Sequence, residues 1–203
     1  MDVVSVTEEA DAFTCNAYLV LGDTVTLVDA GAMEGVVDAI REHTDHLDEV
    51  VLTHQHADHV AELDAVVEAF DPAVYGYAEH PLVTHEIDDG DELRIGDEAF
   101  EVVYTPGHAP DHVALVSEFT LFSGDVVVYN DAAFEDGSFG RTDKTGQSRE
   151  RLIQSIETLL ERLPSTVETL YAGHGDVFEG DVREVIERAL KRAQRREPKY
   201  PEE

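Results

Sequence analysis

The sequence predicts an α/β protein built as an αββα sandwich, in which two mixed β-sheets pack together and helices cover their outer faces. Strand-like segments followed by helical segments occur in each half of the chain, and this order favours two sheets whose remaining apolar faces are covered by helices. The 203 residues contain no internal repeat and no long linker, so we expect a single domain over residues 1–203.

The first half begins with a predicted hairpin, because the turn dipeptide Gly22-Asp23 separates two apolar runs. Apolar periodicity predicts a helix at residues 34–43 and another at 60–70, which Asp71-Pro72 ends. The strands expected in this half lie at residues 17–21, 24–29, 49–53 and 73–77.

The second half repeats the order of strands and then helices. Gly96-Asp97 marks its first hairpin turn, and Ser148 is the expected N-cap of a helix at residues 149–162. The polar segment 126–147 is long enough to indicate a functional loop, and a last helix is expected at 181–195. The strands predicted in this half lie at residues 92–95, 98–105, 113–117, 120–123 and 166–171.

Acidic residues dominate the charge, with 45 Asp and Glu against 14 Lys and Arg and a formal net charge of −31. Recurrent apolar segments argue against an acidic disordered chain. Self-repulsion at this charge opposes compaction in dilute buffer, whereas molar salt shortens the screening length to about 3 Å. The spread of the acids and the scarcity of lysine (Lys144, Lys191 and Lys199) therefore favour adaptation to concentrated salt over an acidic face for a cationic partner.

The few basic residues argue against nucleic acid as a partner, because such binding needs basic surface that replaces counterions. Seven of the fourteen bases lie between Arg183 and Lys199. They form either a contact for an anionic group or, as we favour, the basic face of an amphipathic helix docked on an acidic body.

The chain start lacks the pattern of a signal peptide, and no run reaches 18 apolar residues. We therefore expect a cytoplasmic protein without a membrane partner, while a homo-oligomer stays open. The one cysteine, Cys15, lies in an apolar run and is expected to be buried.

The densest group of metal-binding side chains is the run Thr53-His54-Gln55-His56-Ala57-Asp58-His59. Imidazole suits Zn, Fe or Cu, and carboxylate can serve beside it. In an extended backbone His54 and His56 point to the same side, and the following Asp-His pair can turn toward a second point. Four ligands on one short loop favour two metal ions over one.

Three further candidate ligands each follow a predicted strand, as the histidine run does. His108, Asp125 and His174 each come directly after a glycine, on a turn that would expose the side chain. Because strand ends at one edge of a sandwich converge, we expect these segments to meet at one site. Another histidine, His112, either lines the pocket or, as we favour, lies in solvent or behind a ligand.

These segments resemble the motifs of the metallo-β-lactamase-fold hydrolases over roughly residues 15–175. The resemblance implies the αββα fold and two divalent metal ions, with Zn first and Fe or Mn as alternatives. The matching segments are Val28-Asp29-Ala30-Gly31, the run at 53–59, Thr105-Pro106-Gly107-His108, Ser123-Gly124-Asp125 and Ala172-Gly173-His174-Gly175.

The resemblance also implies a role for each ligand. Asp125 would bridge the two metals, and a shared hydroxide would attack an electrophilic carbonyl. Asp58 would orient this hydroxide or move its proton, so Asp58 and Asp125 are the expected catalytic residues. Asp29 would either support a ligand histidine or only form a turn. The implied ligands are His54, His56 and His108 for the first metal, and Asp58, His59 and His174 for the second.

The dipeptide Gly140-Arg141, followed by Thr142-Asp143, is similar to glyoxalase II and persulfide dioxygenase relatives. Arg141 either structures this loop through an acid such as Asp143 or contacts substrate, and we favour the structural role.

The resemblance implies a metallo-hydrolase that cleaves a thioester or related small ester, as hydroxyacylglutathione hydrolase does. The alternative is a mononuclear iron persulfide dioxygenase, with His54, His108 and Asp125 as ligands. A second alternative is a non-catalytic metal-binding member of the fold, which the intact ligand set disfavours. For the enzymes the expected partner is a small-molecule substrate.

Overall fold

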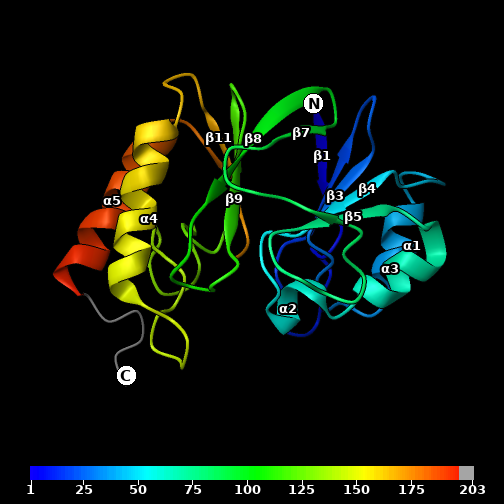
Figure 1. Cartoon of the computed structure of the whole chain (residues 1–203), viewed down its shortest axis with the longest axis horizontal. Coiled ribbons are helices and arrows are strands. Elements are labelled where there is room, and N and C mark those ends of the chain that lie inside the picture. The colour runs from blue at the N-terminus through cyan, green and yellow to red at the C-terminus, as the bar shows by residue number, and fades with distance from the viewer. Residues whose placement is uncertain (197–203) are drawn as a thin grey trace. The chain divides into compact units, whose positions relative to one another are not determined.

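The computed structural model describes residues 1–196, and its strands form two six-stranded sheets accompanied by five helices within those residues (Figure 1). Each sheet contains both parallel and antiparallel pairs, so the predicted α/β class with two mixed sheets is confirmed. The chain divides into two compact units, residues 1–100 and 101–203, and the expected single domain stays a prediction.

The first sheet has its strands in the order of the sequence. Its first three strands pair antiparallel, and the next pairs, β3–β4, β4–β5 and β5–β6, are parallel. Parallel pairing places the carboxyl ends of β3 and β4 at the same edge of this sheet. The strands are β1 (Asp2–Ser5), β2 (Tyr18–Leu21), β3 (Thr26–Val28), β4 (Glu49–Val51), β5 (Ala73–Gly76) and β6 (His85–Glu86).

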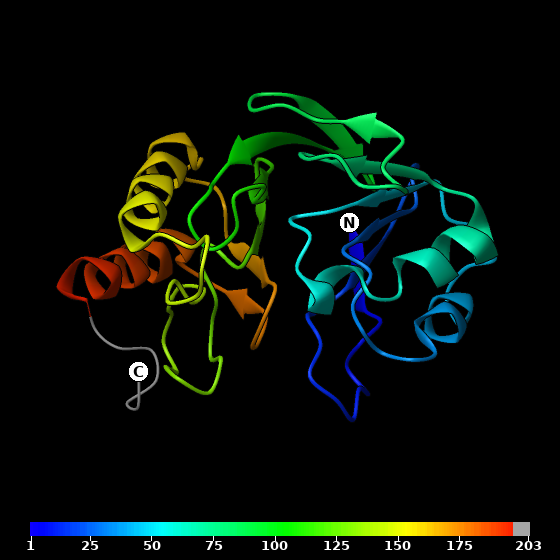
Figure 2. The ribbon, with the colours of Figure 1, turned by 60° about the horizontal axis from the view of Figure 1, so that its bottom comes forward.

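Three helices belong to the first unit, and α1 and α3 lie side by side in both ribbon views (Figures 1 and 2). Their apolar faces join the sheet in one core, to which Leu27, Val36, Val50 and Leu63 contribute fully buried side chains. The predicted burial of Cys15 is confirmed, since its exposed fraction is 0%. The helices are α1 (Val36–Arg41), α2 (Ala57–Val60) and α3 (Leu63–Phe70).

The second sheet has the order β12-β11-β10-β9-β8-β7. Strands β10 and β11 pair in parallel, which brings their carboxyl ends to the same edge. The strands are β7 (Glu92–Ile95), β8 (Glu98–Tyr104), β9 (Val113–Val116), β10 (Thr120–Gly124), β11 (Thr169–Ala172) and β12 (Phe178–Glu179).

Two long helices, α4 (Arg149–Arg162) and α5 (Val182–Arg195), pack against each other in the second unit (Figures 1 and 2). Their apolar faces and the strands of the second sheet share one buried core. The predicted N-cap is confirmed, because the Ser148 hydroxyl accepts a hydrogen bond from the amide of Arg151 at 3.3 Å.

Several predicted boundaries differ from the structure. The helix expected at 34–43 begins only at Val36, because Gly35 has a left-handed backbone with φ of 94°. The helix expected at 60–70 is wrong as one element: α2 begins earlier, at Ala57, and residues 61–62 separate it from α3. The short strands β1, β6 and β12 were not predicted from the sequence.

The basic face of α5 docks on the protein itself, as the favoured interpretation predicted. Arg183 donates to the carbonyl groups of Leu160 and Leu163, at 3.0 and 2.7 Å. Arg188 and Arg192 form ion pairs with Asp136, at 3.4 and 2.7 Å. Of the predicted cluster, Lys199 lies outside the described residues.

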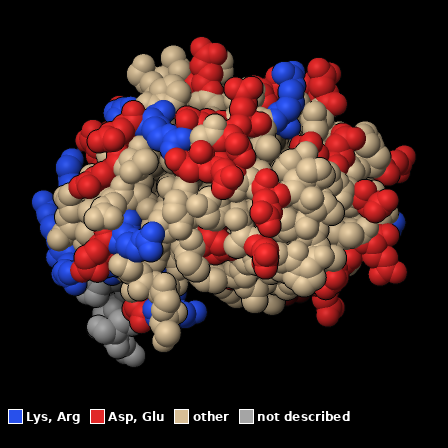
Figure 3. All heavy atoms as spheres, viewed as in Figure 1, with Lys and Arg blue, Asp and Glu red and all other residues tan. Residues whose placement is uncertain are grey.

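Figure 3 shows acidic side chains over much of the drawn face, while basic side chains gather on the side where Figure 1 places α4 and α5. Among residues 1–196, no helix is both long and apolar enough to span a bilayer.

Replacing Ile156 by alanine should test the core of the second unit. Its side chain is fully buried between α4 and the sheet, so Ile156→Ala should lower the free energy of unfolding by about 2–5 kcal/mol. Urea unfolding in molar salt measures the change, and exposed Glu161 on the same helix supplies the control variant Glu161→Ala. Equal stability of the two variants would contradict this packing.

Candidate metal centre

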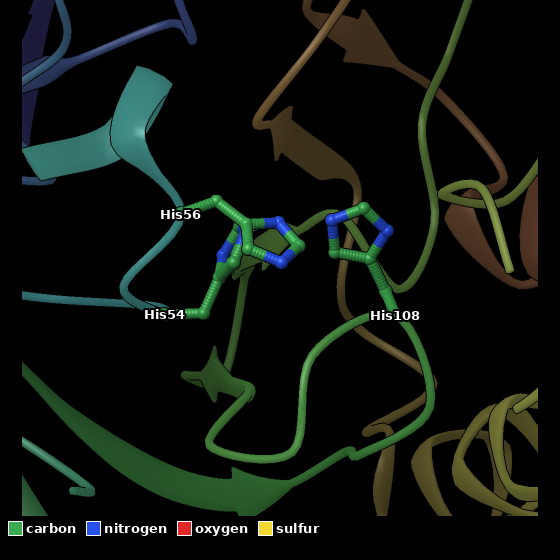
Figure 4. Close-up of side chains that lie close together, drawn as sticks. All are labelled: His54, His56 and His108. Carbon is green, nitrogen blue, oxygen red and sulfur yellow. The ribbon is translucent and has the colours of Figure 1, made fainter. Parts of the chain in front are cut away.

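His54 and His56 follow the buried strand β4, and the backbone at His56 is extended, with ψ of 148°. Atom Nε2 of His54 is 3.1 Å from Nδ1 of His56, and the ring centroids are 4.6 Å apart (Figure 4). The predicted orientation of both rings to the same side is therefore confirmed. Two imidazole nitrogens at this distance share either one proton or one cation, so this pair suits a metal ion.

Asp58 and His59 lie in the first turn of α2, which corrects the expected loop over the whole run. His56 keeps an extended backbone, with ψ of 148°, and the helix begins at the next residue. The His59 ring nevertheless stays beside the extended segment, because its centroid lies 4.0 Å from that of His54. The His59 ring is fully buried, whereas the Asp58 side chain is 22% exposed.

Asp29 supports a ligand histidine and also forms the turn after β3. Its backbone is left-handed, with φ of 59°, and its carboxylate is buried. One oxygen accepts from the amide of Thr53 at 2.8 Å; the other accepts from the Thr53 hydroxyl at 2.7 Å and from Nδ1 of His59 at 2.8 Å. Because a carboxylate accepts, Nδ1 of His59 holds the proton and Nε2 keeps its lone pair for a metal.

The second unit brings together the other three predicted ligands. Atom Oδ2 of Asp125 lies 3.2 Å from Nε2 of His108 and 3.5 Å from Nε2 of His174. His108 and Asp125 are almost fully buried, and the side chain of His174 is 19% exposed. Nδ1 of His108 donates to the carbonyl of Arg141 at 2.9 Å, so its Nε2 also keeps a lone pair on the side of Asp125.

Gly140 explains why a glycine precedes Arg141 in the loop motif. Its amide donates to the carbonyl of Asp125 at 2.7 Å. A Cβ atom at this position would lie 2.3 Å from that carbonyl oxygen and 2.6 Å from Nδ1 of His108. Only a residue without a side chain lets the loop approach both ligands so closely.

Arg141 has the favoured structural role, since its guanidinium forms two hydrogen bonds with the carboxylate of Asp143, at 2.8 and 2.5 Å. The hydrogen bonds from Arg141 hold the pKa of Asp143 below its ordinary value. Arg149 at the start of α4 reaches back to the Thr142 hydroxyl at 2.8 Å, which ties this part of the loop to the helix.

The turn that carries His108 is fixed against α4. Gly107 has φ of 137°, and a Cβ there would lie 2.4 Å from the amide nitrogen of Leu152. The carbonyl of Gly107 accepts from the amide of Ser148 at 2.8 Å, and the carbonyl of Pro106 accepts from the Ser155 hydroxyl at 2.6 Å. Helix α4 therefore holds the backbone on both sides of this glycine.

The donor chemistry of both units fits divalent metal ions. Imidazole and carboxylate are the ligands of Zn, Fe and Mn sites, and in each unit a buried histidine presents a lone pair beside a carboxylate. The first unit holds four of the predicted ligands, His54, His56, Asp58 and His59, and the second holds His108, Asp125 and His174.

Comparison with known proteins places this donor set in a family. The family described as the Metallo-beta-lactamase superfamily matches residues 10–197. The chain belongs to the metallo-beta-lactamase superfamily. This membership agrees with the resemblance that the sequence motifs indicate and with the two mixed sheets.

Two curated relatives of this superfamily member differ in how much they share with it. The probable metallo-hydrolase YqgX of Bacillus subtilis is 32% identical over 184 residues, which cover 79% of this chain and 84% of the relative. The hydroxyacylglutathione hydrolase of Vibrio cholerae is 36% identical over 104 residues, covering 50% of this chain and 41% of that enzyme. The chain thus spans about two fifths of the length of such hydroxyacylglutathione hydrolases.

Solved structures share the fold of this metallo-beta-lactamase superfamily chain over nearly its full length. ETHE1 from Myxococcus xanthus has a TM-score of 0.76 at 24% identity, covering 95% of this chain and 84% of that one. TTHA1623, solved in a di-iron-bound form, has a TM-score of 0.71 at 27% identity, covering 93% and 98%.

Replacing Asp29 by asparagine should weaken metal binding. Asparagine tolerates the left-handed backbone, so Asp29→Asn removes mainly the negative charge and one acceptor beside His59. We expect the zinc dissociation constant, measured by competition with a chelator, to rise about 10- to 100-fold. The exposed Asp38 supplies the control Asp38→Asn; equal affinities in the two variants would contradict the role of Asp29.

A methyl group at Gly140 should have a similar effect through geometry alone. Gly140→Ala must displace the Asp125 carbonyl or the His108 ring, so we expect zinc affinity to fall by at least about tenfold. Thr145→Ala is the control, because Thr145 lies in the same loop and is exposed. If both variants kept wild-type affinity, Gly140 would not position the ligands.

Proposed function

We propose that the protein is a metal-dependent hydrolase that cleaves a thioester or related small ester. In this proposal the seven predicted ligands would hold two divalent metal ions, zinc first, and Asp125 would serve as a ligand to both. The observation that carries the proposal is the proton arrangement of the buried histidines. Nδ1 of His59 and of His108 each donate to an acceptor of the protein, which leaves the lone pair on Nε2 for a metal.

The relatives support a hydrolase. YqgX, matched over most of both chains, is described as a probable metallo-hydrolase. The hydroxyacylglutathione hydrolase of Vibrio cholerae is matched over 104 residues, which argues for thioester chemistry in this part of the fold. Since the match covers 41% of that enzyme, the acyl group and the thiol carrier stay open.

The chain's own residues would orient water and move its proton. When bound, the metals would lower the pKa of a water molecule toward neutrality and polarise the substrate carbonyl. Asp58 is the more exposed of the two acids beside His59, with 22% of its side chain exposed against 2% for Asp29. We therefore assign Asp58 the proton of the attacking water, at a carboxylate oxygen, and assign Asp29 the orientation of His59.

A mononuclear iron persulfide dioxygenase is the second candidate function. Two histidines and one carboxylate form an iron site with open positions for oxygen, and His54, His108 and Asp125 offer this set. The observation that favours iron is the relative TTHA1623, which was solved with two irons at 27% identity. Its two irons argue for iron in this type of site and do not by themselves favour a mononuclear centre.

Metal content separates the two functions. For protein purified in molar salt without added metal, we expect about two equivalents of zinc per chain and hydrolysis within a panel of thioesters and lactones. Asp125→Ala should reduce turnover by at least about 100-fold, since it removes the proposed bridge. The exposed Glu118 supplies the control Glu118→Ala, which should keep wild-type turnover.

One iron per chain, together with oxygen consumption and sulfite formation from a persulfide, would instead establish the second candidate. Protein that binds no metal under any of these conditions would contradict both functions.

A further inference from the structure

His112 is a fully buried histidine that the proposed ligand set does not use. It lies on the connection between β8 and β9, four residues after the proposed ligand His108, and its ring centroid is 6.3 Å from that of His108. Of the two favoured expectations, solvent or a position behind a ligand, its exposed fraction of 0% excludes solvent.

Hydrogen bonds assign the proton of the His112 ring. The backbone amide of Asp125 donates to Nε2 of His112 at 2.8 Å. Because an amide can only donate, Nε2 carries no proton, and the neutral ring therefore has its proton on Nδ1. That Nδ1–H donates to the hydroxyl of Thr105 at 2.8 Å, and Thr105 is itself fully buried.

Thr105 and His112 also close the loop that carries His108. The amide of Thr105 donates to the carbonyl of His112 at 2.9 Å, which joins the end of β8 to the start of β9. The ring of His112 thus rests on a fixed backbone and extends from it to the end of β10, where Asp125 lies.

Both backbone polar groups of Asp125 are held in consequence. His112 accepts from its amide, and Gly140 donates to its carbonyl at 2.7 Å. The preceding Gly124 has a left-handed backbone with φ of 48°, so the chain turns sharply just before this clamp. The clamped backbone sets where the carboxylate stands, 3.2 Å from Nε2 of His108 and 3.5 Å from Nε2 of His174.

We propose that His112 is a positioning residue, which places the Asp125 carboxylate by accepting the Asp125 amide on Nε2 while Thr105 fixes the proton on Nδ1. A role as metal ligand does not fit, because both ring nitrogens already serve hydrogen bonds inside the second unit. The inference rests on the proposed function in one respect: the placement of Asp125 matters for metal binding only if Asp125 is a ligand.

The proton assignment is tested directly by the ring ¹⁵N chemical shifts of His112, measured by NMR on metal-free and zinc-loaded protein. The expected result is a protonated Nδ1 and an unprotonated Nε2 in both forms. A proton on Nε2 would overturn the proposal, since that nitrogen could not accept from Asp125. This measurement decides the assignment whether or not the protein hydrolyses any substrate.

Zinc affinity tests the consequence for the metal site. His112→Phe keeps the ring volume but offers no acceptor, so the zinc dissociation constant should rise about 10- to 100-fold. His112→Gln offers a side-chain oxygen that can accept from the Asp125 amide in place of Nε2, so it should recover most of the lost zinc affinity. His43→Phe is the matched control, since His43 is exposed beyond α1 in the first unit, and it should bind zinc as the wild type does.

Thr105→Val covers the case in which His112→Phe does not fold. This substitution removes the hydroxyl that fixes the His112 tautomer, so we expect an intermediate loss of zinc affinity, whereas Thr105→Ser should retain it. Unchanged affinity in a folded His112→Phe or in Thr105→Val would overturn the proposal. A wild-type protein that binds no zinc would contradict the proposed function instead, and the ¹⁵N shifts would still decide the role of His112.

Discussion

Parallel pairing of two strands in each unit is the constraint on which both ligand sets depend. In the first sheet Val28 of β3 pairs with Val51 of β4, so the residues that follow, Asp29 and Thr53, emerge at the same edge. In the second sheet Gly124 of β10 pairs with Ala172 of β11, and Asp125 and His174 emerge beside each other. Residues far apart in sequence become neighbours because paired parallel strands have their carboxyl ends at the same edge of the sheet.

The strand ends and the ligand types could be predicted from the sequence, because each depends on short-range patterns. Apolar runs identify β4, β10 and β11, of which the last two end at Gly124 and Gly173, and the spacing of His54 and His56 fixes their shared side. Boundaries that depend on a single backbone conformation were harder to predict. The left-handed Gly35 delays α1, and the extended His56 lets α2 begin at Ala57, a change of conformation that apolar periodicity does not register.

Contacts between distant segments lie beyond such patterns. The sequence did not decide whether Asp29 is a turn residue or a hydrogen-bond partner for a histidine. It is both, because one left-handed residue can end a strand and still direct its carboxylate inward. The clamp on Asp125 joins residues that are 13 and 15 positions away from it in the sequence, His112 and Gly140. Gly140 is needed because the Asp125 carbonyl leaves no room for a side chain, but in the sequence it cannot be told from a glycine in an ordinary turn.

The arginines of α5 do little to offset the net negative charge that the composition gives the molecule. Arg183, Arg188 and Arg192 direct their guanidinium groups at backbone carbonyls and at Asp136, so these three positive charges are engaged inside the molecule. The surrounding solution therefore meets an excess of negative potential. An anionic molecule diffusing toward this protein is repelled at low ionic strength, and its encounter rate rises as salt is added, the reverse of electrostatic steering.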